Sequence, residues 1–378
     1  MSTRLRTMTV IGTRPEIIRL APTIKLLDKT TDHVLVHTGQ NADYEMNEVF
    51  FEDLGLRRPD VFLNADTSSL GAVMGTTLSG IEGPLREHKP EAFLVLGDTN
   101  SAVSALMARR LGVPVFHMEA GNRSFDENVP EETNRRFVDH IADYNLVYTE
   151  HARRNLLAEG IHPARLLLTG SPMAEIQNEY ADAIASSTVL ADLGLNKGEY
   201  FLVSLHRQEN VDEPERLLRL LKALEKLSKE FGLPVMVSTH PRTKRRLDEL
   251  GAESFDGLTF HKPFGFRDYM ALQINSKLVL SDSGTISEES SLMGFPAVSL
   301  RDAIERPEAV DTAAALLTGS DPDHIIEMTK FAIDMWDTNG PAAVPEAYAI
   351  DDFSRRVVSY VMSNARTHHQ RSGVRIHI

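Results

Sequence analysis

A run of small polar residues at 281–285 has the composition of an anion-binding site. It follows the apolar segment 278–280 and precedes a helical pattern. The backbone N–H groups at a helix start, together with the hydroxyls of Ser283 and Thr285, can bind a phosphate, and the helix dipole favours negative charge there. Alternatively, Ser283 only caps the helix and Glu288 completes a capping box. The two interpretations are compatible, and we favour the phosphate site.

Residues 117–136 form a second candidate site. An apolar strand is predicted at 113–116, and three arginines and five carboxylates follow it around one Gly and one Pro. Such a stretch after a buried strand is typical of an active-site loop in an open α/β sheet. Taken alone, it is equally compatible with an ordinary solvated loop.

Two histidines and an aromatic loop extend the set in the second half of the chain. His206 and His240 follow consecutive predicted strands, each beside arginines. Equivalent strand-end histidines indicate phosphate contacts or proton transfer. The loop 262–269, with Pro263 and Phe264, can offer an aromatic face to a planar base, although this pattern is also typical of core packing.

Alternating strand and helix patterns must position these residues. Strands are predicted at 7–11, 33–37, 93–96, 113–116, 145–148, 165–168, 200–205, 235–238, 258–261, 277–280 and 297–300. Amphipathic helical patterns separate them, which predicts doubly wound parallel sheets in an α/β fold. Because strand carboxyl ends share one edge of such a sheet, we expect Arg14, Gln40, Asp98 and Glu119 to gather there.

The chain is expected to form two Rossmann-like domains that face each other across a cleft. A break at 170–172 separates a first domain, 1–172, from a second, 173–352. Ligand sites are common between such domains. The segment 353–378 is expected to return to the first domain through a C-terminal helix. Its tail, 366–378, shows no period and is read as a mobile end or an oligomer contact.

Composition excludes several classes of protein. The 378 residues carry a net charge of −14, which argues against nucleic-acid binding, and contain no cysteine, which excludes disulfides and thiolate sites. No apolar run reaches the ~20 residues of a membrane span, and no signal peptide is recognised, so a cytoplasmic location is expected. The absence of G-x-G-x-x-G after the first strand and of a P-loop motif argues against dehydrogenases and P-loop enzymes.

Seven motifs carry a resemblance that covers nearly the whole chain except the last dozen or so residues. In order, they are Gly12-Thr13-Arg14-Pro15-Glu16, Thr38-Gly39-Gln40, Gly97-Asp98-Thr99, Glu119-Ala120-Gly121, Pro130-Glu131-Glu132-Thr133-Asn134-Arg135, His206-Arg207 and Ser281-Asp282-Ser283-Gly284. Together they resemble the non-hydrolysing UDP-N-acetylglucosamine 2-epimerase family. The resemblance implies a GT-B-like fold, a homodimer, a UDP-N-acetyl sugar as substrate, and no cofactor or metal.

Some details are closer to one branch of that family. Met118, Asn122 and the run 125–132 resemble the enzymes that form UDP-N-acetyl-L-fucosamine from UDP-2-acetamido-2,6-dideoxy-L-talose. The common family pattern has Leu at Asn122 and Lys at Arg19. UDP-GlcNAc/UDP-ManNAc, the substrate pair of the family as a whole, is the first substrate prediction. The 6-deoxy-talose sugar, which these details favour, is the alternative.

The resemblance also implies a mechanism and its residues. UDP leaves C1 as a proton leaves C2, and both return to the resulting 2-acetamidoglycal, the proton from the opposite face. The implied catalytic residues are Asp98, Glu119, Glu131 and His206, with mutual repulsion expected to raise the carboxyl pKa values. The predicted UDP-sugar contacts are Arg14, Gln40, Arg135, His240, Arg242, Pro263, Phe264, Ser283, Gly284, Thr285, Glu289, Arg301 and Arg306. A glycosyltransferase of the same architecture, a hydrolysing relative and a nucleotide-sugar sensor are the competing readings.

Overall fold

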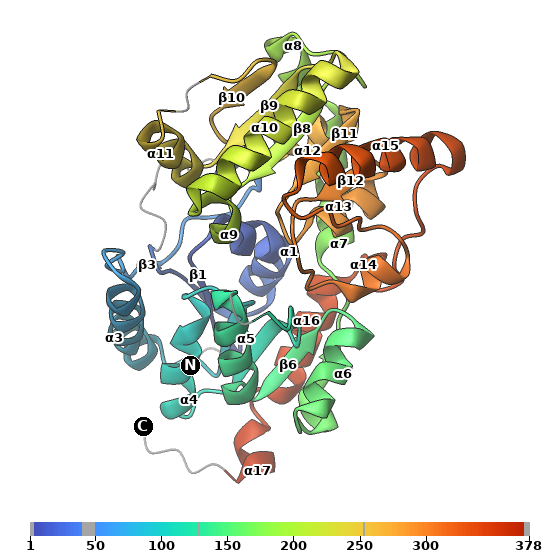
Figure 1. Cartoon of the computed structure of the whole chain (residues 1–378). Helices are drawn as coiled ribbons and strands as arrows, with labels where there is room; N and C mark the ends of the chain where they lie inside the picture. The colour runs from blue at the N-terminus through green and yellow to red at the C-terminus, as the bar shows by residue number, and fades with distance from the viewer. Residues whose placement is uncertain (1–3, 40–49, 127–128, 252–253, 374–378) are drawn as a thin grey trace. The chain divides into compact units, whose positions relative to one another are not determined.

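A computed structural model describes residues 4–39, 50–126, 129–251 and 254–373. The chain divides into two compact units, one of residues 1–178 and 346–378 and the other of residues 179–345. Each unit is an α/β structure built on a fully parallel sheet (Figure 1). The predicted fold class of two doubly wound parallel sheets is therefore confirmed.

The first unit contains a seven-stranded sheet in the order β3-β2-β1-β4-β5-β6-β7. Its strands are β1 (Arg6–Ile11), β2 (Asp32–His37), β3 (Val61–Phe62), β4 (Ala92–Leu96), β5 (Val115–Ala120), β6 (Tyr144–Val147) and β7 (Leu166–Leu168). β4 is buried along its whole length, as expected for a parallel strand covered by helices on both faces. The strand order reverses between β1 and β4, so their carboxyl ends mark the position where open α/β sheets bind ligands.

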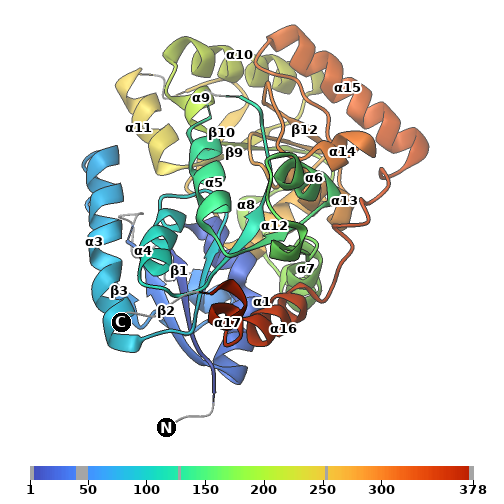
Figure 2. The same ribbon diagram turned by 90° about the horizontal axis from the view of Figure 1, so that it is seen from below.

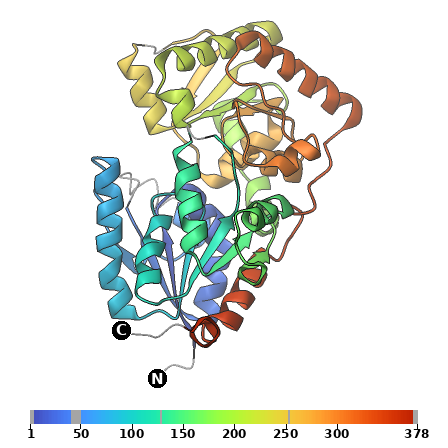
Figure 3. The same cartoon turned by 60° about the horizontal axis from the view of Figure 1, so that its bottom comes forward.

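Helices connect these strands. They are α1 (Arg14–Thr30), α3 (Leu70–His88), α4 (Ala105–Arg110), α5 (Pro130–Ile141), α6 (Glu150–Ala158), α7 (Met173–Ala185), α16 (Phe353–Asn364) and α17 (His368–Ser372), with short 3-10 turns at Ala102–Ser104 and Pro163–Arg165. α7 runs from the first unit into the second. α16 packs against α1, which Figures 2 and 3 show as a red helix beside a blue one. The expected return of the C-terminal helix to the first unit is confirmed.

The tail 366–378 was expected to be a mobile end or an oligomer contact, and its described part, 366–373, packs on the first unit. Arg366 pairs with Glu91 at 3.1 Å, and the ring of His369 donates to the carbonyl of Gly112 at 2.6 Å. These contacts attach α17 to the first unit. A helical period cannot reveal them, because their partners lie more than 250 residues away in the sequence.

The second unit contains a five-stranded sheet in the order β10-β9-β8-β11-β12. Its strands are β8 (Phe201–Leu205), β9 (Val235–Thr239), β10 (Leu258–His261), β11 (Leu278–Ser281) and β12 (Ala297–Ser299). The order reverses between β8 and β11, as it does between β1 and β4. Residues that follow β8 and β11 are therefore at the ligand-binding position of this sheet.

The helices of the second unit follow clear local signals. They are α8 (Val189–Leu193), α9 (Gln208–Val211), α10 (Pro214–Phe231), α11 (Pro241–Glu249), α12 (Phe266–Asn275), α13 (Ile286–Met293), α14 (Pro307–Asp311) and α15 (Pro322–Asn339). α10 begins with Pro, buries Leu217, Leu220, Leu224 and other leucines along one face, and ends at the left-handed Gly232. α10 packs beside α15 (Figure 1).

Strand β5 is longer than the sequence predicts. The apolar run ends at Phe116, but the strand continues through His117 and Glu119, which are both buried. These polar side chains remain inside because remote residues of α1 and α5 bind them. Among the described residues, no helix is long and apolar enough to cross a bilayer.

Candidate active site

The turn after β1 is joined to the loop after β4 by one buried carboxylate. Glu16, on the first turn of α1, accepts hydrogen bonds from the backbone N–H groups of Gly12 and Thr13 (2.9 and 2.7 Å) and from the Thr99 hydroxyl (2.8 Å). Burial raises the pKa of Glu16 to about 7, although these hydrogen bonds act to lower it. Glu16 thereby holds together the two loops that carry Arg14 and Asp98.

Gly12 allows this turn to approach its neighbours closely. A Cβ atom at this position would lie 2.1 Å from both the Ser101 and Thr38 hydroxyl oxygens. Those two hydroxyls are hydrogen-bonded to each other at 3.0 Å. The requirement for Gly is therefore one of space at a buried contact.

Asp98 is held by helix α5. Its carboxylate forms an ion pair with Arg135, which is almost fully buried, and its backbone carbonyl accepts a hydrogen bond from the Asn134 amide at 3.0 Å. Glu131 lies one turn before Arg135 on the same face of α5 and is half-buried. The ends of β4 and α5 therefore bring Asp98 and Arg135 together, with Glu131 on the adjoining turn.

Glu119 has an unusual backbone conformation for its residue type. Its φ is +59°, and the pairing of β5 with β6 shifts register between Met118 and Ala120. A non-glycine residue in this region costs of order 1–3 kcal/mol and is concentrated at functional sites. Glu119 is only 5% exposed, and its carboxylate pairs with Arg19 of α1. A Cβ atom on Gly97 would lie 3.5 Å from Glu119 Oε2, which places this carboxylate beside the loop of Asp98.

These ion pairs change the expected electrostatics. The sequence suggested carboxylates that repel one another, whereas Asp98 and Glu119 each have their own arginine partner, Arg135 and Arg19. Of the other residues predicted for this edge, Arg14 begins α1 with its guanidinium 5.8 Å from the Phe50 ring centre. Gln40 lies outside the described residues.

His206 and Asp282 form a dyad at the carboxyl ends of β8 and β11. His206 Nδ1 lies 3.0 Å from Asp282 Oδ1, and the Asp282 carboxylate also accepts the backbone N–H groups of His206 and Arg207 at 3.0 Å each. Because an ionised carboxylate only accepts hydrogen bonds, this contact places a proton on Nδ1 and leaves Nε2 to exchange one. The His206 side chain is 37% exposed and can therefore meet a ligand.

Asp282 is a candidate site residue to which its sequence motif, Ser281-Asp282-Ser283-Gly284, assigned no role. Burial alone would raise its pKa, but the charge and hydrogen bond of His206, with hydrogen bonds from Arg207 and Asn210, lower it overall. Asn210 also donates to the Leu300 carbonyl at 2.9 Å. The available signal was an acidic residue directly after an apolar strand, between two serines.

The predicted phosphate loop lies between β11 and α13. The Ser283 and Thr285 hydroxyls are 2.8 Å apart, and the backbone N–H of Thr285 donates to Ser283 Oγ at 3.3 Å. A Cβ atom on Gly284 would lie 3.3 Å from the Arg207 guanidinium, so this cation adjoins the loop. Hydroxyls, helix-start N–H groups and a nearby guanidinium form a suitable environment for a phosphate.

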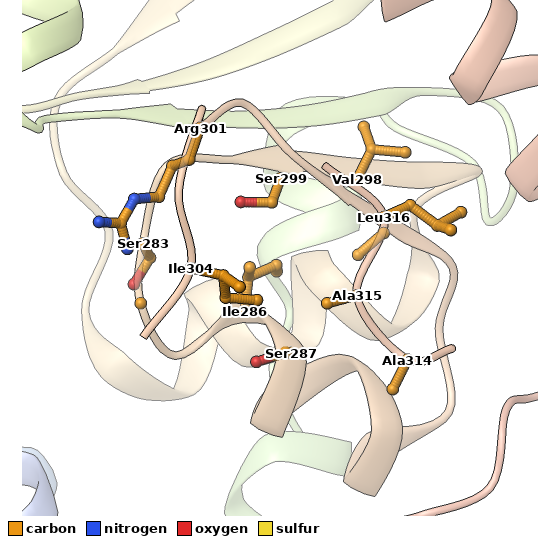
Figure 4. Close-up of a pocket in the computed structure, with 12 residues that line it drawn as sticks. Ser283, Ile286, Ser287, Val298, Ser299, Arg301, Ile304, Ala314, Ala315 and Leu316 are labelled. Carbon is orange, nitrogen blue, oxygen red and sulfur yellow. The ribbon is translucent and has the colours of Figure 1, made fainter. Parts of the chain in front are cut away.

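A small cavity adjoins this loop (Figure 4). Ser283 and Arg301 lie on one side of it and Leu316 on another, while Ile286 and Ile304 stand between them. Arg301 is nearly buried, and its guanidinium donates to Glu305 at 3.2 Å. Arg301 thus adjoins the phosphate loop and forms a salt bridge with Glu305, while its predicted contact with the sugar stays a prediction.

Arg306 and Glu289 occupy interior positions. Arg306 pairs with the fully buried Glu288 at 2.8 Å, so both side chains lie within the second unit, and Glu288 is committed to this ion pair. Glu289 is also buried and accepts a hydrogen bond from the Gln273 amide at 2.7 Å. Arg306 therefore has a structural contact inside the second unit, and the Gln273 amide orients the Glu289 carboxylate. Their predicted contacts with a ligand stay predictions.

The predicted site residues in the loops after β9 and β10 differ in what they contact. His240 caps α11 by accepting the N–H of Arg242 at 3.2 Å, and its ring centre lies 6.4 Å from that of His206. Arg242 is paired with Asp212, with Nε 3.0 Å from Oδ1. Phe264, next to Pro263, stacks on His261 at 4.1 Å and is largely buried. His240 is therefore beside the dyad, while Arg242 and Phe264 also stabilise their own loops.

Comparison with known proteins places this geometry in a family. A family model described as UDP-N-acetylglucosamine 2-epimerase matches residues 25–362. A Methanocaldococcus jannaschii protein named UDP-N-acetylglucosamine 2-epimerase is 38% identical over 341 residues, covering 86% of this chain and 91% of that protein.

Solved structures agree with this match. A structure of UDP-N-acetylglucosamine 2-epimerase from Rickettsia bellii is 40% identical with a TM-score of 0.89, covering 97% of this chain and 98% of that one. The M. jannaschii UDP-GlcNAc 2-epimerase in complex with UDP-GlcNAc and UDP is 34% identical with a TM-score of 0.90, covering 95% of this chain and 100% of that one. The predicted GT-B-like fold and isomerase class are confirmed, and this chain belongs to the UDP-N-acetylglucosamine 2-epimerase family.

Proposed function

We propose that this chain interconverts UDP-GlcNAc and UDP-ManNAc by eliminating UDP and adding it back to a 2-acetamidoglycal. The observation that carries the proposal is the convergence of Asp98 and Glu119 at the ends of adjacent strands, each paired with a buried arginine. The C2–H bond of the sugar is not acidic, so its proton is lost as the C1–O bond to UDP breaks. Such a reaction needs a stabilised leaving group and acid/base groups for both faces of the sugar.

The second unit supplies the groups proposed to stabilise the leaving UDP. The Gly284 N–H and the hydroxyl groups of Ser283 and Thr285 bind the diphosphate, assisted by Arg301 beside the same loop. His206 Nε2 donates to a phosphate oxygen or receives a proton, because Asp282 occupies its Nδ1. Glu289, whose carboxylate the Gln273 amide orients, is proposed to bind the ribose hydroxyls.

The first unit supplies the proposed acid and base. Asp98, Glu119 and Glu131 exchange the C2 proton, and Arg135 and Arg19 keep the first two carboxylates oriented. Arg14 and Gln40 are proposed to contact the diphosphate and sugar. Oriented carboxylates favour proton transfer because little rearrangement is needed in the transition state.

Turnover in deuterium oxide tests the reaction. UDP-GlcNAc should gain deuterium at C2, detected by proton NMR, while no free sugar accumulates. Asp98→Asn and Glu131→Gln should still bind UDP but lose turnover. Epimerisation with C2 fully protonated contradicts elimination, and sugar transfer to an added acceptor without C2 exchange supports a glycosyltransferase instead.

A second substrate, UDP-2-acetamido-2,6-dideoxy-L-talose, is supported by Asn122. This residue replaces the Leu of the common family pattern, lies three residues after Glu119 and is buried. Within the described part of the chain, its Nδ2 atom is buried without a hydrogen-bond partner, so packing alone does not explain the polar residue. We therefore propose that this segment selects the sugar. Offering both substrates side by side decides between them by their kcat/KM values.

We further propose that the protein acts in the cytoplasm as a homodimer, as the sequence resemblance implies. Light scattering of the purified chain measures its mass in solution. A monomeric mass at catalytic concentrations contradicts the dimer. Fractionation of cells that express the full chain tests the compartment, and recovery outside the cytoplasm contradicts that part.

A further inference from the structure

The face of helix α5 that bears Glu131 and Arg135 also bears a third charged residue, Asp139. Asp139 lies four residues after Arg135 and eight after Glu131, so the three residues share one side of the helix. Arg135 binds Asp98. Asp139 is fully buried and contacts the segment around Glu119.

The Asp139 carboxylate binds β5 on both sides of Glu119. Its Oδ1 atom is 2.9 Å from Nδ1 of His117, two residues before Glu119. The backbone N–H of Gly121, two residues after Glu119, points to both carboxylate oxygens at 3.2 Å. One side chain thus spans the residue with φ of +59° and the adjoining register shift.

His117 connects the same contact to the loop of Asp98. Its Nε2 atom donates to the carbonyl of Gly97 at 2.7 Å. Gly97 directly precedes Asp98, and Glu119 Oε2 lies beside the position of a Cβ atom on Gly97. The position of Asp139 therefore affects the backbone of both carboxylates.

The far side of Asp139 is held by a cation. Arg123 is fully buried and lies 2.8 Å from Asp139 Oδ2, and it also binds Glu159 through two hydrogen bonds of 2.8 and 2.7 Å. Glu159 is partly exposed and stabilises Arg123 from the opposite end. Asp139 and Glu159 are thus acidic partners of one arginine, but only Asp139 reaches the backbone next to Glu119.

We propose that Asp139 is a positioning residue that maintains the left-handed conformation of Glu119 and so aims its carboxylate at the sugar. This proposal rests on the proposed function of Glu119. An isolated glutamate favours other backbone regions, so this conformation persists only where surrounding contacts enforce it. Contacts with His117 and Gly121 provide that constraint without touching the substrate.

The test compares Asp139→Asn with Glu159→Gln in the full chain. An Asn side chain has one acceptor oxygen and no charge, so it cannot bind the Gly121 N–H and Arg123 as the carboxylate does, and Glu119 should lose its orientation. Displacement of a catalytic group by about 1 Å can reduce the rate ~100-fold, so kcat should fall ~10- to 100-fold while KM stays near its wild-type value. A substrate deuterated at C2 should also show a larger isotope effect on kcat, since proton transfer becomes slower.

Glu159→Gln weakens the contacts of the same arginine, Arg123. We expect this variant to have a lower unfolding free energy and a wild-type kcat. Urea unfolding of both variants measures the structural effect, and equal kcat losses in the two variants overturn the proposal. Wild-type kcat in Asp139→Asn overturns it as well. The wild-type chain is assayed first: absence of C2 exchange there rejects the proposed function, whereas normal wild-type exchange with an unaffected Asp139→Asn rejects only the positioning role.

Discussion

Replacing Asp282 by Asn should affect stability and catalysis together. Asp282 is fully buried and accepts from the backbone of His206 and Arg207, from the ring of His206 and from the Asn210 amide. Asn can place its oxygen where Asp282 Oδ2 receives three of these donors. Its amide group then faces His206 Nδ1, where an acceptor is required.

The magnitude follows from the loss of charge. Hydrogen bonds to charged groups contribute about 1.5–3 kcal/mol each and neutral ones about 0.5–1.5, so the three contacts that Asn keeps weaken by about 1–1.5 kcal/mol each, about 3–4.5 kcal/mol in total. The His206 proton should also move to Nε2, which removes the acceptor from the ligand side. We therefore expect lower stability and a large loss of kcat.

Asp302→Asn is the matched control in the same unit. Asp302 also pairs with an arginine, Arg216 at 2.7 Å, but its side chain is 62% exposed, and surface pairs contribute about 0–1 kcal/mol. Urea unfolding gives the two stability changes, and C2 exchange gives the two rates. If Asp282→Asn is no more destabilising than Asp302→Asn and keeps its rate, the assigned role of the dyad is wrong.

Two further substitutions test the first unit. Gly12→Ala should reduce the unfolding free energy by about 1–3 kcal/mol in urea, because its methyl group overlaps two buried hydroxyls, whereas Gly75→Ala, which meets nothing within 4 Å in α3, should be neutral or stabilising. Glu16→Gln tests how the stability depends on pH. Because the folded state raises the pKa of Glu16 from 4.5 to about 7, its contribution to the unfolding free energy is complete below pH 4.5 and is lost as the pH rises through 7, roughly 3 kcal/mol in total. The unfolding free energy, measured with urea from pH 4.5 to 8, should therefore fall more steeply with pH in the wild type than in Glu16→Gln. Parallel curves would reject the raised pKa.

Local sequence was sufficient for most elements. The boundaries predicted for α10 and α12 match the structure, because helix period, an N-terminal Pro in α10 and the following Gly232 act within a few residues. Strand ends were also predictable, since apolar runs give way to polar loops there. The placement of His206 directly after β8 and of Asp98 two residues after the end of β4 follows from that pattern alone.

Partners distant in the sequence were not predictable in this way. Strand β5 was expected to end near Phe116, because a polar side chain normally ends an apolar run. It continues because Arg19, from α1, binds Glu119, and Asp139, from α5, binds the surrounding backbone. These partners are 100 and 20 residues from Glu119 in the sequence, beyond the range of any local period.

The sequence by itself determined the alternation of strands and helices, and with it the parallel sheets and the chemistry available at their carboxyl ends. Only the tertiary structure decided how those groups are paired. In the folded chain, Arg135 pairs with Asp98, Arg306 pairs with Glu288, and Asp282 contacts His206 Nδ1. The physical reason is that a local pattern reports the backbone and the buried face of one element, whereas a buried charge takes its partner from whichever element packs against it.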